Sequence, residues 1–152
     1  MKLCSFDYNQ KFTFQYNFWD RFRRIHEEEL PLVLHLARLL AHLVGQQALS
    51  LTIFKAVDFF QLKAMDVLFY RLVFTRLFAD NPLQTVCQLF ERLSSDVKQI
   101  PVRESLQNFF KSAFRKSSLQ QRELYTEEEA AKIRQCLKEI ATIFRQAPTN
   151  LV

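Results

Sequence analysis

Residues 30–60 read LPLVLHLARLLAHLVGQQALSLTIFKAVDFF, and the first half of this stretch is almost entirely apolar. Only His35, Arg38 and His42 interrupt the Leu, Val and Ala side chains between Pro31 and residue 44. They are three and four residues apart, so on a helix they form one narrow stripe with apolar side chains around the rest of the circumference. About fifteen residues of helix extend roughly 22 Å, which is too short to cross a bilayer. We therefore expect a helix that is buried by protein on several sides.

The turn within this stretch is marked by Gly45 and Ser50. Gly45 stands where the end of a helix favours a residue with positive φ, and Ser50 stands where the next helix needs an N-cap. The pattern predicts a helical hairpin whose second arm covers residues 50–59.

The rest of the chain also favours helices. One glycine and four prolines leave little material for the tight turns of β-hairpins. Apolar periodicity and capping signals at Asn81-Pro82, Pro101 and Thr126 predict an all-α fold of about seven helices in antiparallel hairpins. Short connections favour the packing of sequential neighbours, and the hairpins are expected to stack as a short solenoid. The expected helices cover residues 11–26, 30–44, 50–59, 62–78, 82–93, 102–114 and 126 to about 148.

Residues 6–26 admit two interpretations. Aromatic residues at positions 12, 14, 16 and 18 alternate with polar ones, as in a half-buried strand. Apolar residues at positions 14, 18, 22 and 25 recur at helical spacing instead. No other segment alternates in a way that could pair with such a strand, so we expect a helix.

Composition and motifs exclude several classes of function. The net charge of +5 is compatible with a polyanionic partner such as RNA, although many proteins with this charge bind none. Cys4, Cys87 and Cys136 are widely separated and lack metal-site spacing, which favours reduced thiols in an intracellular protein. His35 and His42 are about 10 Å apart along a helix, too far to share a metal. No phosphate loop, nucleophile elbow or H-E-x-x-H motif occurs, so we expect no catalysis, cofactor or small-molecule substrate. No transmembrane run occurs either, so we expect no membrane span.

Three ordered segments carry a family resemblance: FTFQYNFWDRF at residues 12–22, LARLLAHLVGQQALSLTIFKAVDF at 36–59 and VLFYRLVFTRLF at 67–78. They resemble the C-terminal MA-three domain of the nucleolar proteins that carry a middle domain of initiation factor 4G, the suppressor of glycerol defect family. The motifs that match are Trp19-Asp20, Leu49-Ser50-Leu51 and Val57-Asp58-Phe59.

The resemblance implies a HEAT-like helical array in the nucleus and nucleolus. It further implies a non-enzymatic adaptor that acts on pre-ribosomal particles in small-subunit ribosomal RNA maturation and binds a DEAD-box helicase of the initiation-factor-4A type. Residues 1–93 would form the MA-three-like domain, without its first helix or part of it, and residues 94–152 a helical extension packed on it. The alternative is a truncated structural or interaction module with no independent activity.

Three acids are candidates for contact with the helicase: Asp20, Asp58 and Asp66. Each lies among aromatic or apolar residues near the expected end of a helix, where a carboxylate can hold the basic surface of a partner. Helix capping or a local ion pair is the competing explanation for each one.

Two basic groups are candidates for contact with RNA. Arg21, Arg23 and Arg24 follow Trp19, and together they would pair phosphate contacts with base stacking, but three glutamates at positions 27–29 offset their charge. A second group is opposed only by Glu104 and Glu123, and a solvated helix face is its alternative interpretation. This C-terminal group consists of Arg103, Lys111, Arg115, Lys116 and Arg122.

Overall fold

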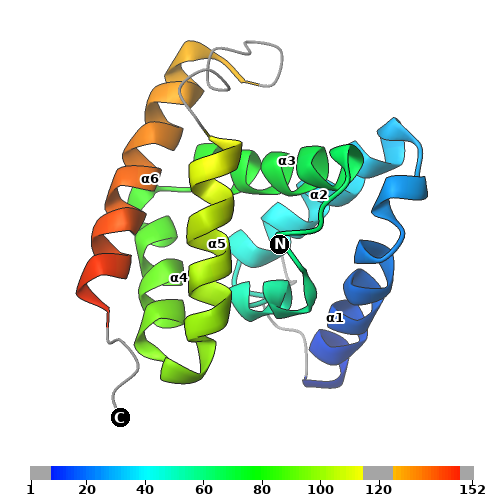
Figure 1. Cartoon of the computed structure of the whole chain (residues 1–152), viewed down its shortest axis with the longest axis horizontal. Helices are drawn as coiled ribbons and strands as arrows, with labels where there is room; N and C mark the ends of the chain where they lie inside the picture. Colours follow the sequence, from blue (N-terminus) through cyan, green and yellow to red (C-terminus); the bar gives the residue numbers. More distant parts are fainter. Residues whose placement is uncertain (1–7, 115–124, 148–152) are drawn as a thin grey trace. The chain divides into compact units, whose positions relative to one another are not determined.

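The computed structural model describes residues 8–114 and 125–147, and within these ranges it contains helices and no strands (Figure 1). The all-α prediction is confirmed, because each of the predicted segments forms a helical element. One of them, residues 51–56, is a 3₁₀ helix instead of an α-helix. The elements are α1 (Tyr8–Phe22), η2 (Ile25–Glu27), α2 (Leu30–Gly45), η3 (Leu51–Ala56), α3 (Ala64–Asp80), α4 (Leu83–Ser95), η4 (Val97–Gln99), α5 (Ile100–Ala113) and α6 (Glu127–Gln146).

The chain divides into two compact units, Met1–Leu77 and Phe78–Val152, and the boundary lies inside α3. The division at residues 93 and 94 that the family resemblance suggests is a different one and stays a prediction.

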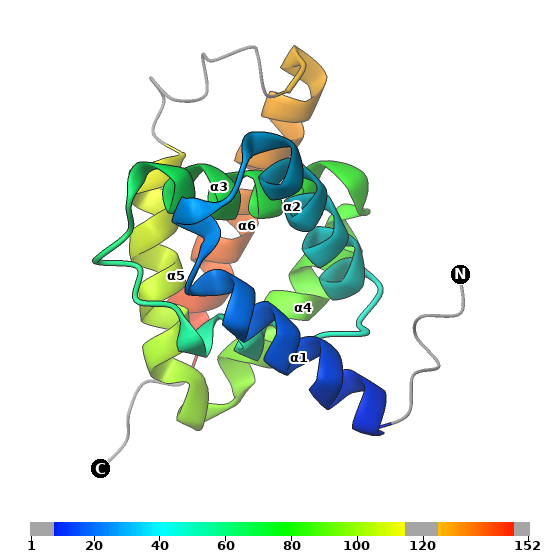
Figure 2. The same cartoon turned by 90° about the vertical axis from the view of Figure 1, so that its right-hand side faces the viewer.

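Unit 1 (Met1–Leu77) contains α1, α2, η3 and most of α3. The ambiguous N-terminal segment is a helix, with Phe18 and Phe22 buried. α1 ends four residues earlier than expected, because η2 turns the chain toward α2, which runs in broadly the opposite direction (Figure 2). Rings from three elements then form the core: Phe22 lies 6.3 Å from Phe54 and 5.5 Å from Tyr70, centroid to centroid.

The end of α2 differs from the prediction. Gly45 is a buried residue of the helix itself, and the positive φ belongs to Gln47, at 61°. The Ala48 N–H donates to the Leu43 carbonyl at 2.9 Å, and the Gln47 N–H donates to Val44 at 3.0 Å. These two bonds form a Schellman motif, so the left-handed residue lies two positions after the glycine.

The turn after α2 also changes the second arm of the predicted hairpin. Ser50 is the N-cap as expected, since its Oγ accepts the Thr52 N–H at 3.2 Å. The element that it caps is a 3₁₀ helix of six residues, which packs against α1. Residues 30–60 are therefore one α-helix followed by a short 3₁₀ turn, not a hairpin of two α-helices.

The expectation that α2 is buried on several sides is met only toward its C-terminal end, where residues 40, 41, 43, 44 and 45 are buried. His35, Arg38 and His42 are exposed, in agreement with a polar stripe. Leu34 and Leu39, which flank this stripe, are exposed with them, as is Leu30 at the start of the helix. The first part of α2 thus leaves leucines in solvent.

Unit 2 (Phe78–Val152) contains the three long helices α4, α5 and α6. In Figure 1, α5 runs antiparallel to both α4 and α6, which makes α4 and α6 parallel to each other. The backbones of α4 and α6 approach each other over the longest stretch, although these helices are not consecutive. Sequential packing, the expectation from short connections, is therefore only part of the arrangement. The rings of Phe90 and Phe144 lie 5.8 Å apart between α4 and α6.

The capping signals of unit 2 are mostly where the sequence predicts them. Thr126 and Glu129 form a capping box, in which the Glu129 N–H donates to Thr126 Oγ1 at 3.1 Å and the Thr126 N–H donates to Glu129 Oε1 at 3.0 Å. Pro101 lies in the first turn of α5, as expected. At the start of α4 the N-cap is Pro82 instead of Asn81, a shift of one residue.

Candidate partner-binding surfaces

Asp20 and Asp58, two of the predicted partner-binding acids, are exposed in unit 1. Asp20 lies in the last turns of α1, and its Oδ2 lies 2.7 Å from Arg24 Nη2. Asp58 follows η3, and its Oδ1 accepts the Phe60 N–H at 3.0 Å. Each carboxylate therefore has a local partner, as the competing explanation expected. Because both groups stay in solvent, each also remains accessible to another protein.

Asp66 is different, because the side chain is buried with 8% of its surface exposed. Its Oδ2 accepts the Lys63 N–H at 3.0 Å at the start of α3, and its Oδ1 lies 4.0 Å from His26 Nδ1. Burial, and secondarily the charge of Asp66, raise the pKa of the neighbouring Tyr70 well above its usual range. A carboxylate held in this position stabilises the first turn of α3 and cannot reach a partner surface, so Asp66 is withdrawn from the partner-binding set.

Two residues of the predicted RNA-binding group of unit 2, Arg103 and Lys111, belong to the described part of the chain. Arg103 is buried with 5% of its surface exposed, and its Nη1 lies 3.5 Å from the Ser94 carbonyl oxygen. This burial removes Arg103 from the candidate RNA-binding residues. Lys111 is exposed on α5. Arg115, Lys116 and Arg122 lie outside the described residues.

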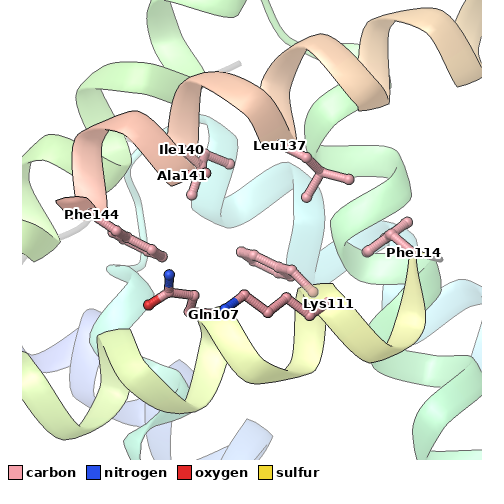
Figure 3. A pocket seen from close by; sticks show the side chains of 8 residues that line it. Gln107, Lys111, Phe114, Leu137, Ile140, Ala141 and Phe144 are labelled. Carbon is pink, nitrogen blue, oxygen red and sulfur yellow. The ribbon is translucent and has the colours of Figure 1, made fainter.

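A groove lies between α5 and α6 beside Lys111, with a volume of about 220 Å³ (Figure 3). Leu137, Ile140 and Phe144 point from α6 toward α5, and the polar ends of Gln107 and Lys111 lie on the α5 side. The volume is below the roughly 300–1,000 Å³ that is typical of small-molecule sites. The groove is thus a small apolar depression with one basic residue at its side.

The sequence did not predict this groove. Phe110 and the C-cap residue Phe114 come from the α5 side, whereas Ile140 and Phe144 come from α6. The apolar stripe of each helix is visible in the sequence, but the spacing between two stripes depends on how their side chains interdigitate.

Within residues 8–114 and 125–147, the cysteines and histidines belong to no group of side chains that could hold a metal ion. Cys136 is fully buried on α6, where burial raises the pKa of its thiol to about 11. Burial and the charges of Glu139 and Glu91 raise the pKa of Cys87. Both thiols are thereby kept protonated and poorly nucleophilic at neutral pH.

Among the described residues, none of the helices has the length and apolar character that a membrane crossing requires.

Comparison with known proteins identifies relatives. No family model and no solved structure matches the chain. Human nucleolar MIF4G domain-containing protein 1 is 34% identical over 110 residues, which are 71% of this chain and 13% of the human protein. The Drosophila melanogaster homolog of that protein is 30% identical over 109 residues, covering 72% of this chain and 13% of the relative. Suppressor of glycerol defect protein 1 of Schizosaccharomyces pombe is 33% identical over 112 residues, covering 64% of this chain and 14% of the relative.

The similarity is longer than the segments that carry the resemblance in the sequence. An aligned stretch of 110 residues cannot fit within residues 1–93, so it extends into the C-terminal part of the chain. The chain spans only about 13% of the length of the human and fly relatives. The names of these relatives support a nuclear, nucleolar location and a nucleolar role. Over about 70% of its length, this chain is a homologue of the nucleolar MIF4G domain-containing proteins and of suppressor of glycerol defect protein 1.

Proposed function

We propose that the chain is a non-enzymatic helical adaptor in small-subunit ribosome biogenesis in the nucleolus, and that it binds a DEAD-box helicase of the initiation-factor-4A type. The observation that carries this proposal is the homology to nucleolar MIF4G domain-containing proteins over about 70% of the chain. The helicase and the pre-ribosomal particle come from the family resemblance, and the structure supplies surfaces that suit such a contact.

The most suitable contact residues are the two exposed acids of unit 1. Asp20 and Asp58 are both in solvent, and their local bonds are of a kind that a partner can exchange at little cost: a surface ion pair and a turn. Exposed carboxylates at the rim of an interface steer a basic partner and fix its orientation. We expect the helicase to present lysines or arginines to these two positions.

The test is capture of a recombinant helicase of this type on the immobilised chain. The double variant Asp20→Lys, Asp58→Lys replaces two attractive charges by repulsive ones, and we expect recovery of the helicase to fall at least about tenfold. The measurement is the helicase recovered at equal loading of native and variant chain, at low and at physiological salt.

Asp96→Lys is the matched control. Asp96 is exposed in unit 2, and its Oδ1 accepts the Lys98 N–H at 3.0 Å, the same local geometry that Asp58 has with Phe60. Recovery with Asp96→Lys should equal that of the native chain. Equal recovery with the double variant would reject the two acids as the contact, and no recovery with the native chain would reject the helicase as the partner.

The proposal also includes RNA contact by the C-terminal basic group, of which Lys111 is described and exposed. Changing Lys111, Arg115 and Lys116 to Glu should weaken RNA binding uniformly across sequences and reduce its salt dependence. An RNA affinity that is indifferent to salt, or unchanged in this triple variant, would remove this group from the function.

A further inference from the structure

One face of α1 presents a row of aromatic rings, of which only Trp19 belongs to a site predicted from the sequence. Phe12, Tyr16 and Trp19 are four and three residues apart, so they lie on the same side of the helix, and Arg23 follows four residues later. Phe12 and Tyr16 stack at 6.1 Å between ring centroids, and Tyr16 meets the edge of Trp19 at 5.5 Å. Tyr16 is 60% exposed. A buried helix face would not expose a large aromatic residue to this extent.

The row is held in place from a second element. Trp19 Nε1 donates to the Ile53 carbonyl oxygen at 2.8 Å, which links α1 to η3 across 34 residues. Lys55, also on η3, places its Nζ 5.4 Å from the centroid of the Trp19 ring. The indole is therefore fixed in orientation, and it brings a cation next to the aromatic row. Such a surface loses little conformational entropy when a ligand binds.

The charges beside the row are not balanced. Arg21 pairs with Glu28 at 3.5 Å and Arg24 pairs with Asp20 at 2.7 Å. Arg23 is exposed and has no ion pair with any residue that the structure describes. The sequence alone suggests that the acidic run at positions 27–29 offsets all three arginines. In the structure, Arg23, in the turn directly after α1, is left available, together with Lys55.

We propose that this face of α1, with Tyr16 at its centre, Lys55 beside it and Arg23 in the turn that follows, binds single-stranded RNA. Every base has a π-face that can stack on an exposed ring, and cations next to the ring neutralise the flanking phosphates. Bases in a duplex are already stacked and paired, so the surface selects unpaired nucleotides. The nucleolar relatives make RNA the nucleic acid to consider. This inference does not depend on the helicase contact.

The first experiment uses the purified full chain and a fluorescein-labelled, unstructured RNA such as oligouridine. We expect Tyr16→Ala to weaken binding roughly 5- to 100-fold, the range for the loss of one stacked base. Tyr16→Phe keeps the ring and should stay within about twofold of the native affinity. Phe60→Ala removes a side chain that is 74% exposed but lies in the connection after η3, and it should leave the affinity unchanged.

The second experiment compares neighbouring arginines. Arg23→Ala should lower the affinity, whereas Arg24→Ala should have a smaller effect, because Arg24 is already paired with Asp20. The double variant Arg23→Ala, Lys55→Ala should reduce the slope of log affinity against log salt by about 0.7 for each phosphate that the variant no longer neutralises. Equal effects of the two single arginine variants would contradict the assignment.

The third measurement places the RNA on the chain. Trp19 is the only tryptophan, and its ring touches Tyr16, so stacking on Tyr16 should change the intrinsic tryptophan fluorescence on titration. RNA binding without this change would place the RNA elsewhere and overturn the proposal. So would duplex RNA binding as tightly as single-stranded RNA, or native affinity in a correctly folded Tyr16→Ala variant. If Tyr16→Ala impairs capture of the helicase and not of RNA, the face is a protein contact and the proposal is wrong, while the proposed helicase function stands.

Discussion

The two units of the chain achieve their stability in different ways. Unit 2 is built mainly from three regular helices whose apolar stripes face one another, with the short 3₁₀ helix η4 between α4 and α5 and a capping box at the start of α6. Unit 1 contains two 3₁₀ helices, a left-handed residue at Gln47 and a side-chain-to-backbone bond from Trp19 to Ile53. Rings from α1, η3 and α3 meet in its core, and unit 2 has a ring cluster of its own around Phe90 and Phe110.

The two units also differ in the chemistry of their surfaces. The described surface of unit 2 carries solvated side chains and small depressions, one between α5 and α6 and one between α4 and α6. In unit 1, α1 presents Asp20, a fixed indole and a row of rings, and Asp58 lies in the connection after η3. Four further predictions test this contrast.

The largest effect is expected from the ring cluster of unit 1. Phe54 is 1% exposed and lies 5.0 Å from Phe74 and 6.2 Å from Tyr70. Phe54→Ala should reduce the free energy of unfolding by about 3–5 kcal/mol, because the cavity cannot collapse between rings from several elements. Urea denaturation followed by Trp19 fluorescence measures the loss. Phe60→Ala, at an exposed ring, should stay within about 0.5 kcal/mol of the native chain. A loss of less than about 1 kcal/mol for Phe54→Ala would show that the cluster is loosely packed.

The next effect concerns how tightly α6 is packed in unit 2. Burial raises the pKa of Cys136 from 9.0 to about 11, so at pH 8 about 0.1% of this thiol is ionised. Iodoacetamide should therefore label Cys136 at least roughly a hundredfold more slowly in the native chain than in urea, since burial also blocks access. Labelling is followed by mass spectrometry, and the half-exposed Cys87 is the internal control. The folded thiol holds its proton more tightly than the unfolded one, so stability should decline as pH rises from 9 to 11. Rapid native labelling of Cys136 would show that unit 2 opens readily.

A smaller effect is expected at the capping box. Thr126→Ala removes the acceptor of the Glu129 N–H, and it should cost about 1 kcal/mol in a thermal or urea denaturation. Thr126→Ser keeps the hydroxyl and should be close to native. Ser50→Ala is the comparison in unit 1, where the hydroxyl caps only six residues of 3₁₀ helix. If Ser50→Ala costs more than Thr126→Ala, local capping matters more in the irregular unit.

The smallest effect is a gain. Gln47 has a φ of 61°, a conformation that glycine adopts without steric cost. Gln47→Gly should therefore stabilise the chain by about 0.5–1 kcal/mol. Gln46→Gly is the matched control, because residue 46 has a φ of −85° and gains nothing from glycine. A destabilised Gln47→Gly variant would mean that the glutamine side chain contributes to the turn.

The sequence predicts unit 2 better than unit 1, and the reason is physical. A capping box and an apolar stripe are local features, so Thr126, Glu129 and Ile133 locate α6 without knowledge of the rest of the chain. The left-handed turn after α2 depends on where the chain must go next. Gly45 is the local signal for that turn, but the turn forms at Gln47 and the glycine is buried in the helix.

Candidate sites are less predictable than helices, because accessibility is a tertiary property. In the sequence, the neighbours of Asp66 and Arg103 do not distinguish them from charged residues that are exposed. In the structure, each side chain is buried and hydrogen-bonded within its unit. Arg23 lies next to Arg21 and Arg24 in the sequence. Those two arginines form ion pairs and Arg23 does not, a difference that only the structure shows.

The amino-acid pattern alone was enough for the all-α class, the position of nearly every helix and the family to which the chain is related. These follow from periodicity, caps and ordered motifs, which are short-range in the chain. The tertiary structure was needed for the parallel packing of α4 and α6, the exposed leucines of α2 and the aromatic row of α1. Each of these depends on which helix face meets a neighbour, and that is settled by side-chain packing between residues far apart in sequence.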